Sequence, residues 1–301
     1  MTASRPPRRR PPGRPGGGGP PRGAGGRRPA GRQGGALPGD DGPRRPSRGL
    51  GGEQVEGRHA VRELLLAGRR RARLVLLADD LDPAPIIDEI VELADELRVT
   101  VRRITRASLE AQARSEAPQG VIAHAAPLPE ADLDALCRRG AHGRPPFLLA
   151  LDGVTDPQNV GALLRTAEGA GVTGVLLPRH RSAHISPTAA KVAAGAVEHL
   201  DIAVVGGLPA ALTRARELGL WIVGLDEGGD TSLFDLPVAD QPVVLVLGAE
   251  GSGLGRLTRA RCDVVAAIPL QGRLPSLNVA AAGALACFEV ARRREPGRSQ
   301  P

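Results

Sequence analysis

The segment LDGVTDPQNVGALLRTAEGAG, residues 151–171, joins the end of an apolar run to a polar loop and then to a helical pattern. The loop holds Asp156, Gln158 and Asn159, and Arg165 falls on the second turn of the helix. These residues offer a carboxylate, two amides and one cation, without a glycine-rich phosphate cradle. Such groups orient a polar ligand through hydrogen bonds, so we expect a binding or catalytic loop here.

A glycine-rich loop follows a later apolar run, in LVLGAEGSGLGRL. Gly248 and Gly253 have the spacing of a P-loop, but Leu254 stands where the phosphate-binding lysine is required. A dinucleotide fingerprint also fails, because Arg256 occupies the third glycine position and no acid follows ~20 residues later. The loop still lets backbone approach a ligand closely and carries the carboxylate of Glu250. A glycine-rich turn without a ligand is the alternative.

A third candidate loop lies in IPLQGRLPSLNVAAAGALACFEVARRR. Ser276 and Asn278 come directly before a helix that is predicted to run to about Arg294. Either side chain could act only as an N-cap. The alanines and glycine at 281–284 leave one helix face nearly bare, which predicts a closely packed neighbour.

The strands and helices that position these loops are predicted to form an α/β fold. Apolar runs without polar alternation suit strands of a parallel sheet that is covered by helices on both faces. Parallel sheets bind ligands at the carboxyl ends of their strands, where all three loops fall. The runs are FLLAL, GVLLP, DIAVV, LWIVGL, PVVLVLG and DVVAAIPL.

Three further regions precede this sheet domain, which we assign to residues 147–296. Residues 51–127 predict a small α/β domain, with helices in GRHAVRELLLAG and PAPIIDEIVELADEL, strands in RLVLLA, VTVRRI and GVIAHA, and a third helix starting near Ser108. Residues 128–146 predict a polar linker. Residues 1–50 contain 14 Gly and 11 Pro and almost no large apolar side chain, which predicts a disordered tail.

Charge is concentrated in the tail. Its twelve arginines and two aspartates give +10, so the net charge of +7 leaves −3 on the other 251 residues. We therefore expect attraction to polyanions there. No signal-peptide pattern and no apolar run of ~18–20 residues occurs, so we expect a soluble cytoplasmic protein without membrane contact. The three cysteines and six histidines lack metal-ligand spacing, so we expect no metal.

The segments DPQNVGALLRTA, LVLGAEGSGL and IPLQGRLPSLNVAAA resemble, in order, the three motifs of the SpoU (TrmH-like) RNA ribose 2'-O-methyltransferases. The resemblance covers about residues 147–294. Upstream, GRHAVRELL and QGVIAHA look like the small ribosomal-protein-L30e-like RNA-binding domain of the ribosomal-RNA branch. Residues 1–50 lie outside the match.

The resemblance implies an α/β fold of the SPOUT type with a C-terminal trefoil knot, a homodimer, S-adenosyl-L-methionine as methyl donor, and a ribose 2'-hydroxyl of RNA as acceptor, by resemblance a guanosine of 23S ribosomal RNA. It implies catalytic roles for Asn159, Arg165, Glu250, Ser276 and Asn278. It implies that Leu247, Gly248, Ile268, Leu277 and Asn278 line the donor pocket. This chain departs from the family pattern at Ala280, usually a serine, and at Pro275, which restrains its loop.

Binding of RNA must depend on charge and shape, because three Phe, one Trp and no Tyr offer little stacking surface. The densest basic patch of the small domain is the candidate for phosphate contacts, with a solvated basic face as the alternative. Its members are Arg62, Arg69, Arg70, Arg71 and Arg73.

The sequence leaves several alternatives open for the role of Arg165, for the substrate and for the function. Arg165 either accepts the proton of the 2'-hydroxyl or, staying protonated as guanidinium groups do, stabilises the developing alkoxide. A tRNA is the alternative substrate. A non-catalytic RNA-binding protein on the same fold is the rival from another class. A nicotinamide-dependent oxidoreductase is disfavoured by the missing fingerprint.

Overall fold

The computed structural model describes residues 50–138, 140, 144–180, 185–274 and 276–295. The expected disorder of residues 1–49 and the restraint expected from Pro275 lie outside these ranges. Leu50 is buried and Gly51 pairs with Ile185, so ordered structure includes the last residue of the segment that we assigned to the tail.

A seven-stranded sheet is the centre of the larger domain, with the strand order β7-β6-β5-β10-β8-β11-β9. Every neighbouring pair is parallel, as the continuous apolar runs predicted. The strands are β5 (Phe147–Asp152), β6 (Gly174–Pro178), β7 (Ile202–Val205), β8 (Trp221–Leu225), β9 (Thr231–Ser232), β10 (Val243–Gly248) and β11 (Val264–Ala267).

Alternate residues of these strands enter two separate apolar cores. Leu149 and Leu151 of β5 belong to one core, while Leu148 and Ala150 belong to the other. Side chains alternate across a strand, so the sheet is buried on both faces. The first core is completed by α5 (Pro157–Gly169), α6 (Pro187–Val192) and α9 (Val279–Arg293), the second by α4 (Leu133–Arg138) and α7 (Leu208–Glu217). The short helix α8 (Arg256–Arg259) follows the glycine-rich loop.

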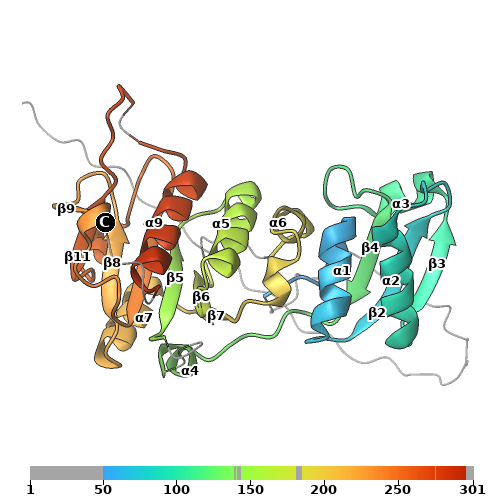
Figure 1. The fold of residues 1–301 in the computed structure, drawn as a ribbon, viewed down its shortest axis with the longest axis horizontal. Coiled ribbons are helices and arrows are strands. Elements are labelled where there is room, and N and C mark those ends of the chain that lie inside the picture. Colours follow the sequence, from blue (N-terminus) through green and yellow to red (C-terminus); the bar gives the residue numbers. More distant parts are fainter. Residues whose placement is uncertain (1–49, 139, 141–143, 181–184, 275, 296–301) are drawn as a thin grey trace, which may run out of the picture. The chain divides into compact units, whose positions relative to one another are not determined.

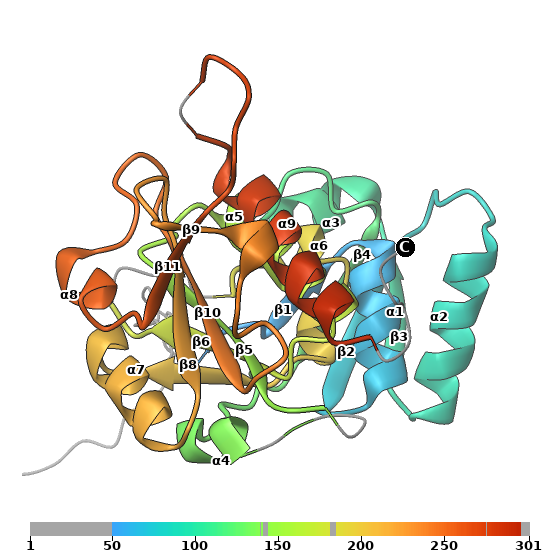
Figure 2. The same cartoon turned by 60° about the vertical axis from the view of Figure 1, so that its left-hand side comes forward.

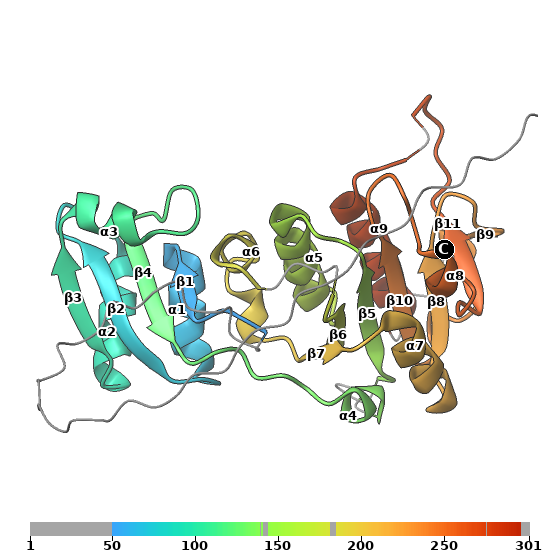
Figure 3. The same cartoon turned by 180° about the vertical axis from the view of Figure 1, so that it is seen from behind.

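The bare face of the last helix packs as the sequence predicted. Figure 1 and Figure 3 both show α9 beside α5. A Cβ atom added to Gly283 would lie 2.3 Å from Leu163 Cδ2 and 2.7 Å from Leu247 Cδ1. Only glycine allows this approach to α5 and β10 without displacement, since real side-chain contacts lie beyond 3 Å.

The smaller domain is built on a four-stranded mixed sheet of order β1-β4-β2-β3. Strands β2 and β3 are parallel, whereas β4 is antiparallel to β1 and β2. Residues of α1 and α2 fill the core on one face, and Leu109 of α3 fills the core on the other. The elements are β1 (Gln54–Glu56), α1 (Arg58–Ala67), β2 (Ala72–Ala78), α2 (Pro85–Glu96), β3 (Thr100–Ile104), α3 (Arg106–Gln112) and β4 (Val121–Ala125).

Some short elements were not foreseen, among them β1, β9 and α4. Strand β1 extends the small sheet at its edge. Helix α4 lies within residues 128–146, which we predicted as a linker, and its Leu136 and Cys137 are buried in the second core. Strand β1 has three residues, β9 has two and α4 has six, which is too few for a periodic signal.

Candidate active site at the carboxyl end of the large sheet

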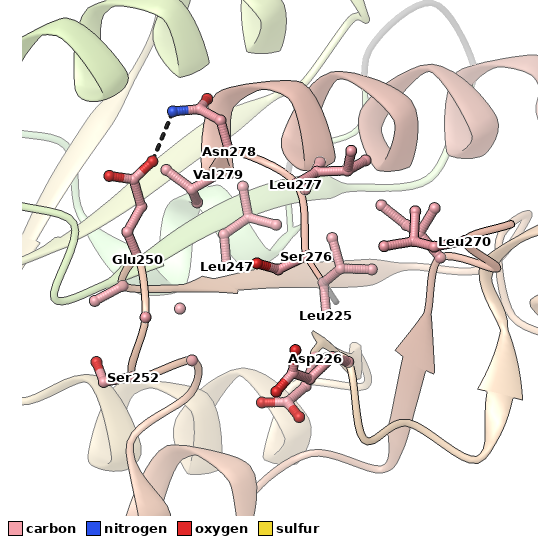
Figure 4. A pocket seen from close by; sticks show the side chains of 17 residues that line it. Leu225, Asp226, Leu247, Glu250, Ser252, Leu270, Ser276, Leu277, Asn278 and Val279 are labelled. Carbon is pink, nitrogen blue, oxygen red and sulfur yellow. Dashed lines mark hydrogen bonds between the residues drawn. The ribbon is translucent and has the colours of Figure 1, made fainter. Parts of the chain in front are cut away.

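A cavity of about 690 Å³ lies where β8, β10 and β11 end (Figure 4). It is bounded by the residues after β8, the glycine-rich loop after β10 and the connection from β11 to α9. That connection extends beyond the strand ends in Figure 2, where it is coloured red. The three loops that the sequence placed at one sheet edge therefore include two that border a single cavity.

The glycine-rich loop folds back on the end of its own strand. A Cβ atom on Gly248 would lie 2.2 Å from the carbonyl carbon of Gly253 and 2.5 Å from the nitrogen of Leu254. Two backbone hydrogen bonds between Ala249 and Gly253, of 3.1 and 2.9 Å, close the turn. Gly248 is buried under this turn, so only glycine fits here, and it also lines the cavity.

Two carboxylates hold this loop from neighbouring strand ends. Asp152 Oδ2 accepts a hydrogen bond of 2.8 Å from the nitrogen of Gly255. Asp226 Oδ2 accepts one of 3.4 Å from Leu254, and Asp226 also forms an ion pair of 2.7 Å with Arg259. Sequence reasoning missed Asp226, although a carboxylate directly after the strand LWIVGL was a usable signal.

Asn278 joins the three motif segments. Its Nδ2 group donates to Asn159 Oδ1 at 3.0 Å and to Glu250 Oε1 at 2.6 Å (Figure 4 shows the second contact). Its Oδ1 accepts from the nitrogens of Ala280 and Ala281 and so caps α9. The N-cap and the site role, which sequence left as alternatives, occur together in one side chain.

The orientation of Asn159 follows from local sequence. Asp156 is the N-cap of α5, and its side chain accepts from the nitrogen of Asn159 at 3.0 Å. Pro157 at the first helical position favours a helix start here. Asn159 is only 8% exposed, so its contact with Asn278 holds the start of α5 against the start of α9.

Two of the predicted site residues, Asn159 and Arg165, do not line the cavity. Arg165 is exposed on α5, does not line the cavity, and has no partner among the described residues. Asn159 contacts the lining residue Asn278. The predicted residues that line the cavity are Leu247, Gly248, Glu250, Ile268, Ser276, Leu277 and Asn278.

The predicted RNA-binding arginines differ in their availability. Arg70 is buried, and its guanidinium donates to both carboxylate oxygens of Glu198, at 2.9 and 2.6 Å. Arg69 pairs with Asp201, and Arg62 with Glu89, whose pKa it holds below the usual range through their hydrogen bond. Only Arg71 and Arg73 are exposed without a side-chain partner in the described ranges.

The described residues also include three cysteine thiols and side chains of types that can ligate metals. They contain no cluster of three or more metal-ligating side chains and no helix that is long and apolar enough to cross a membrane. Burial raises the pKa of the Cys137 and Cys262 thiols to about 11 and that of Cys287 to about 12. These thiols are protonated at neutral pH and are poor nucleophiles.

Comparison with known protein families shows the class of protein to which this chain belongs. The model of the SpoU rRNA methylase family matches residues 146–288. The model for RNA 2'-O ribose methyltransferase substrate binding matches residues 54–131. The chain therefore belongs to the SpoU rRNA methylase family, and both of its domains are accounted for.

The similarity to individual relatives extends over nearly the whole length of those proteins. The chain is 40% identical over 247 residues to the 23S rRNA (guanosine-2'-O-)-methyltransferase RlmB of Pseudomonas aeruginosa, covering 81% of this chain and 98% of the relative. It is 38% identical over 248 residues to the protein of the same name in Photorhabdus laumondii, covering 80% and 98%. The crystal structure of the SpoU methyltransferase AviRb from Streptomyces viridochromogenes in complex with AdoMet matches with TM-score 0.67 and 25% identity, over 80% of this chain and 90% of that one.

Proposed function

We propose that this protein transfers a methyl group from S-adenosyl-L-methionine to the ribose 2'-hydroxyl of a guanosine in 23S ribosomal RNA. The observation that carries this proposal is the Asn278 contact with Asn159 and Glu250, which brings the three family motifs together beside the cavity. The names of the relatives support the substrate, and the AdoMet complex of the AviRb structure supports the donor. The relatives are bacterial proteins named for 23S rRNA, so we also propose a cytoplasmic location.

The cavity fits the donor in size and chemistry. About 690 Å³ lies within the range of ~300–1,000 Å³ for small-molecule sites. Leu247, Ile268 and Leu277 offer apolar surface for a purine, while Gly248, which has no side chain, contributes backbone to the cavity wall. When bound, the donor supplies an electrophilic methyl on a sulfonium. No metal is needed for this chemistry.

The chain's own residues orient the acceptor. Asn159, Glu250 and Asn278 form a fixed polar rim, because each hydrogen bond restrains the next. In-line transfer requires the 2'-oxygen within ~3–3.5 Å of the methyl, and such positioning supplies much of the rate enhancement. Ser276, which also lines the cavity, is a further hydroxyl at that rim.

Arg165 completes the site in a homodimer. It is exposed and outside the cavity of its own chain, so we propose that it enters the site of a second copy and stabilises the developing alkoxide there. Two exposed apolar residues three positions apart on α9 support a dimer face: Leu285 is 42% and Phe288 is 52% exposed. The double substitution of both residues by glutamate is expected to give a monomer in sedimentation, with methylation lost.

We propose that the chain end forms the family's trefoil knot. Close backbone packing near β9 supports threading: a Cβ atom on Gly229 would lie 2.6 Å from the carbonyl carbon of Ala266. We also propose that the smaller domain is L30e-like and binds RNA, with Arg71 and Arg73 on its exposed face. We also propose that the arginine-rich segment 1–50 adds affinity for RNA that falls with salt.

The direct test is site mapping on ribosomal RNA. A strain that lacks the gene is complemented with the wild-type chain, with Asn159→Ala, or with Arg165→Ala, and the 23S RNA is scanned for 2'-O-methyl groups. We expect one guanosine to lose its methyl group in the deletion strain and to regain it only with the wild-type chain. Methylation of a tRNA instead, or full restoration by Asn159→Ala, contradicts the proposal.

A further inference from the structure

A second cavity, of about 310 Å³, lies in the smaller domain, away from all residues of the donor cavity. It is lined by Arg58, His59, Arg106 and Gln119. None of these residues belongs to the arginine patch that the sequence suggested. The lining contains no aromatic ring other than the imidazole, so a stacked base is not its natural occupant.

Each of the two arginines is held through its Nε atom, which leaves the terminal NH₂ groups of its guanidinium available for a ligand. Arg58 Nε donates to the carbonyl oxygen of Gln119 at 3.3 Å, and Arg106 Nε donates to Asp80 Oδ2 at 2.7 Å. The terminal NH₂ groups of both residues have no partner within the described part of the chain. A guanidinium fixed at Nε keeps the fork that matches a phosphate in bidentate fashion.

The charge of the cavity suits a single phosphate. Arg58 and Arg106 contribute two positive charges, and Asp80, the carboxylate paired with Arg106, removes one. One net positive charge matches one phosphodiester, which carries one negative charge along a nucleic acid strand. His59 is exposed at the start of α1 and adds a ring nitrogen that can donate.

The wall of this cavity is a constrained loop. Ala117 and Gln119 have φ values of 49° and 57°, and Gly120 follows at 73°. Non-glycine residues in this region cost energy and persist where the surroundings hold them. Lys191, the single lysine of the chain, donates from α6 to the carbonyl oxygens of Glu116 and Ala117, the second at 2.7 Å.

Gln119 links this loop to the cavity floor. Its Oε1 accepts from the nitrogen of Arg58 at 3.2 Å, while its carbonyl accepts from Arg58 Nε. Arg58 is therefore fixed at two points by one residue. Because Lys191 belongs to the larger domain, the geometry of the cavity is also tied to the domain that carries the donor site.

We propose that this cavity binds one backbone phosphate of the substrate RNA and so anchors the strand that leads to the donor site. The inference rests on the proposed RNA substrate but assigns a site that is separate from the chemistry. Arg58 and Arg106 grip the phosphate oxygens through their terminal NH₂ groups. Gln119 holds the fork of Arg58, and Asp80 holds the fork of Arg106. Recognition is independent of base sequence, as is usual for phosphate contacts.

The test compares a double variant with a single-arginine control on a neighbouring strand. Arg58→Gln/Arg106→Gln removes both forks, whereas Arg102→Gln removes one exposed arginine of β3 that does not line the cavity. Affinity for a fragment of 23S RNA is measured by filter binding from low to high salt. For the double variant we expect about ten-fold weaker binding at low salt and a slope of log K against log salt that is smaller by about 0.7–1, the value for one lost phosphate contact. Arg102→Gln is expected to match the wild type.

Additional measurements distinguish a wrong phosphate site from a wrong proposed function. Binding of RNA and of S-adenosylmethionine is measured without turnover, and thermal melting confirms that each variant is folded. Arg58→Lys, which keeps the charge but not the fork, is expected to lose affinity as well. An unchanged salt slope in the folded double variant, or an equal change in Arg102→Gln, overturns the proposal. Tight binding of inorganic phosphate that RNA does not displace also overturns it.

Discussion

Gly248→Ala is the sharpest perturbation of the donor cavity, because it adds one methyl group where the structure has no room. The new Cβ atom would lie 2.2 Å from the carbonyl carbon of Gly253, 2.3 Å from its oxygen and 2.5 Å from the nitrogen of Leu254. These are backbone atoms, which cannot rotate away. The φ angle of Gly248 is not in the left-handed region, so alanine is disfavoured here by space alone.

The free-energy cost of Gly248→Ala can be worked out from the displacement of the glycine-rich loop. Contacts at about 3.4–4 Å are ordinary, so the loop has to shift by more than an ångström. Such a shift breaks the backbone hydrogen bond of 2.9 Å between Gly253 and Ala249 and the one of 2.8 Å from Gly255 to Asp152. A neutral hydrogen bond contributes about 1 kcal/mol and one to a carboxylate about 1.5–3 kcal/mol, which gives a loss of roughly 3 kcal/mol. This loss is expected in the free energy of unfolding, and donor affinity is expected to fall with it, because the displaced loop no longer shapes the cavity wall.

The assay is isothermal titration with S-adenosylmethionine, paired with urea denaturation of each protein. Gly206→Ala is the matched control, because its added Cβ atom meets nothing within 4 Å and its φ angle is ordinary. The control is expected to bind the donor as the wild type does. Wild-type donor affinity in Gly248→Ala would refute the reasoning, since the loop would then be free to move without affecting the cavity.

Three further substitutions test how the fold is held. Glu198→Gln removes the carboxylate that pairs with the buried guanidinium of Arg70, so urea denaturation is expected to show a loss of about 3–5 kcal/mol, and an unchanged midpoint would contradict this. Gly283→Val places a side chain against Leu163, and we expect about 1–3 kcal/mol of destabilisation by the same assay; a stable variant would show that α5 and α9 are not in fixed contact. Arg294→Ala leaves four backbone carbonyl oxygens without their shared donor, so a fall in the melting temperature equivalent to roughly 2–4 kcal/mol is expected, and no fall would mean that water replaces the guanidinium.

The sequence predicted the parallel sheet because every strand of the large domain that has four or more residues is apolar on both faces, as Leu148 and Leu149 illustrate. It also predicted the close packing at Gly283, since a run of small residues in a helix has no other use in a core. It did not find β1 or α4, which are too short for a periodic pattern. The strand order could not be predicted from the sequence either. Strand β10 pairs with β5, which is distant in sequence, and local residue patterns carry no information about such pairing.

For the site, residue types and spacing located the loops but not their mutual contacts. Asn278 was found as a motif residue, yet its bonds to Asn159 and Glu250 join positions 119 and 28 residues away. The arginine patch shows the opposite case. A cluster of charges in sequence predicted RNA contact, but Arg70 is buried against Glu198, a partner 128 residues distant. Charge density alone does not reveal whether a side chain is already paired.

A crystal structure of the protein with S-adenosylmethionine bound tests the proposed donor site most directly. We expect the donor in the 690 Å³ cavity, in contact with the backbone of Gly248 and the side chains of Ile268 and Leu277, with its methyl group toward Asn159 and Asn278. A donor bound elsewhere on the chain, or a cavity that stays empty at saturating donor, would contradict it.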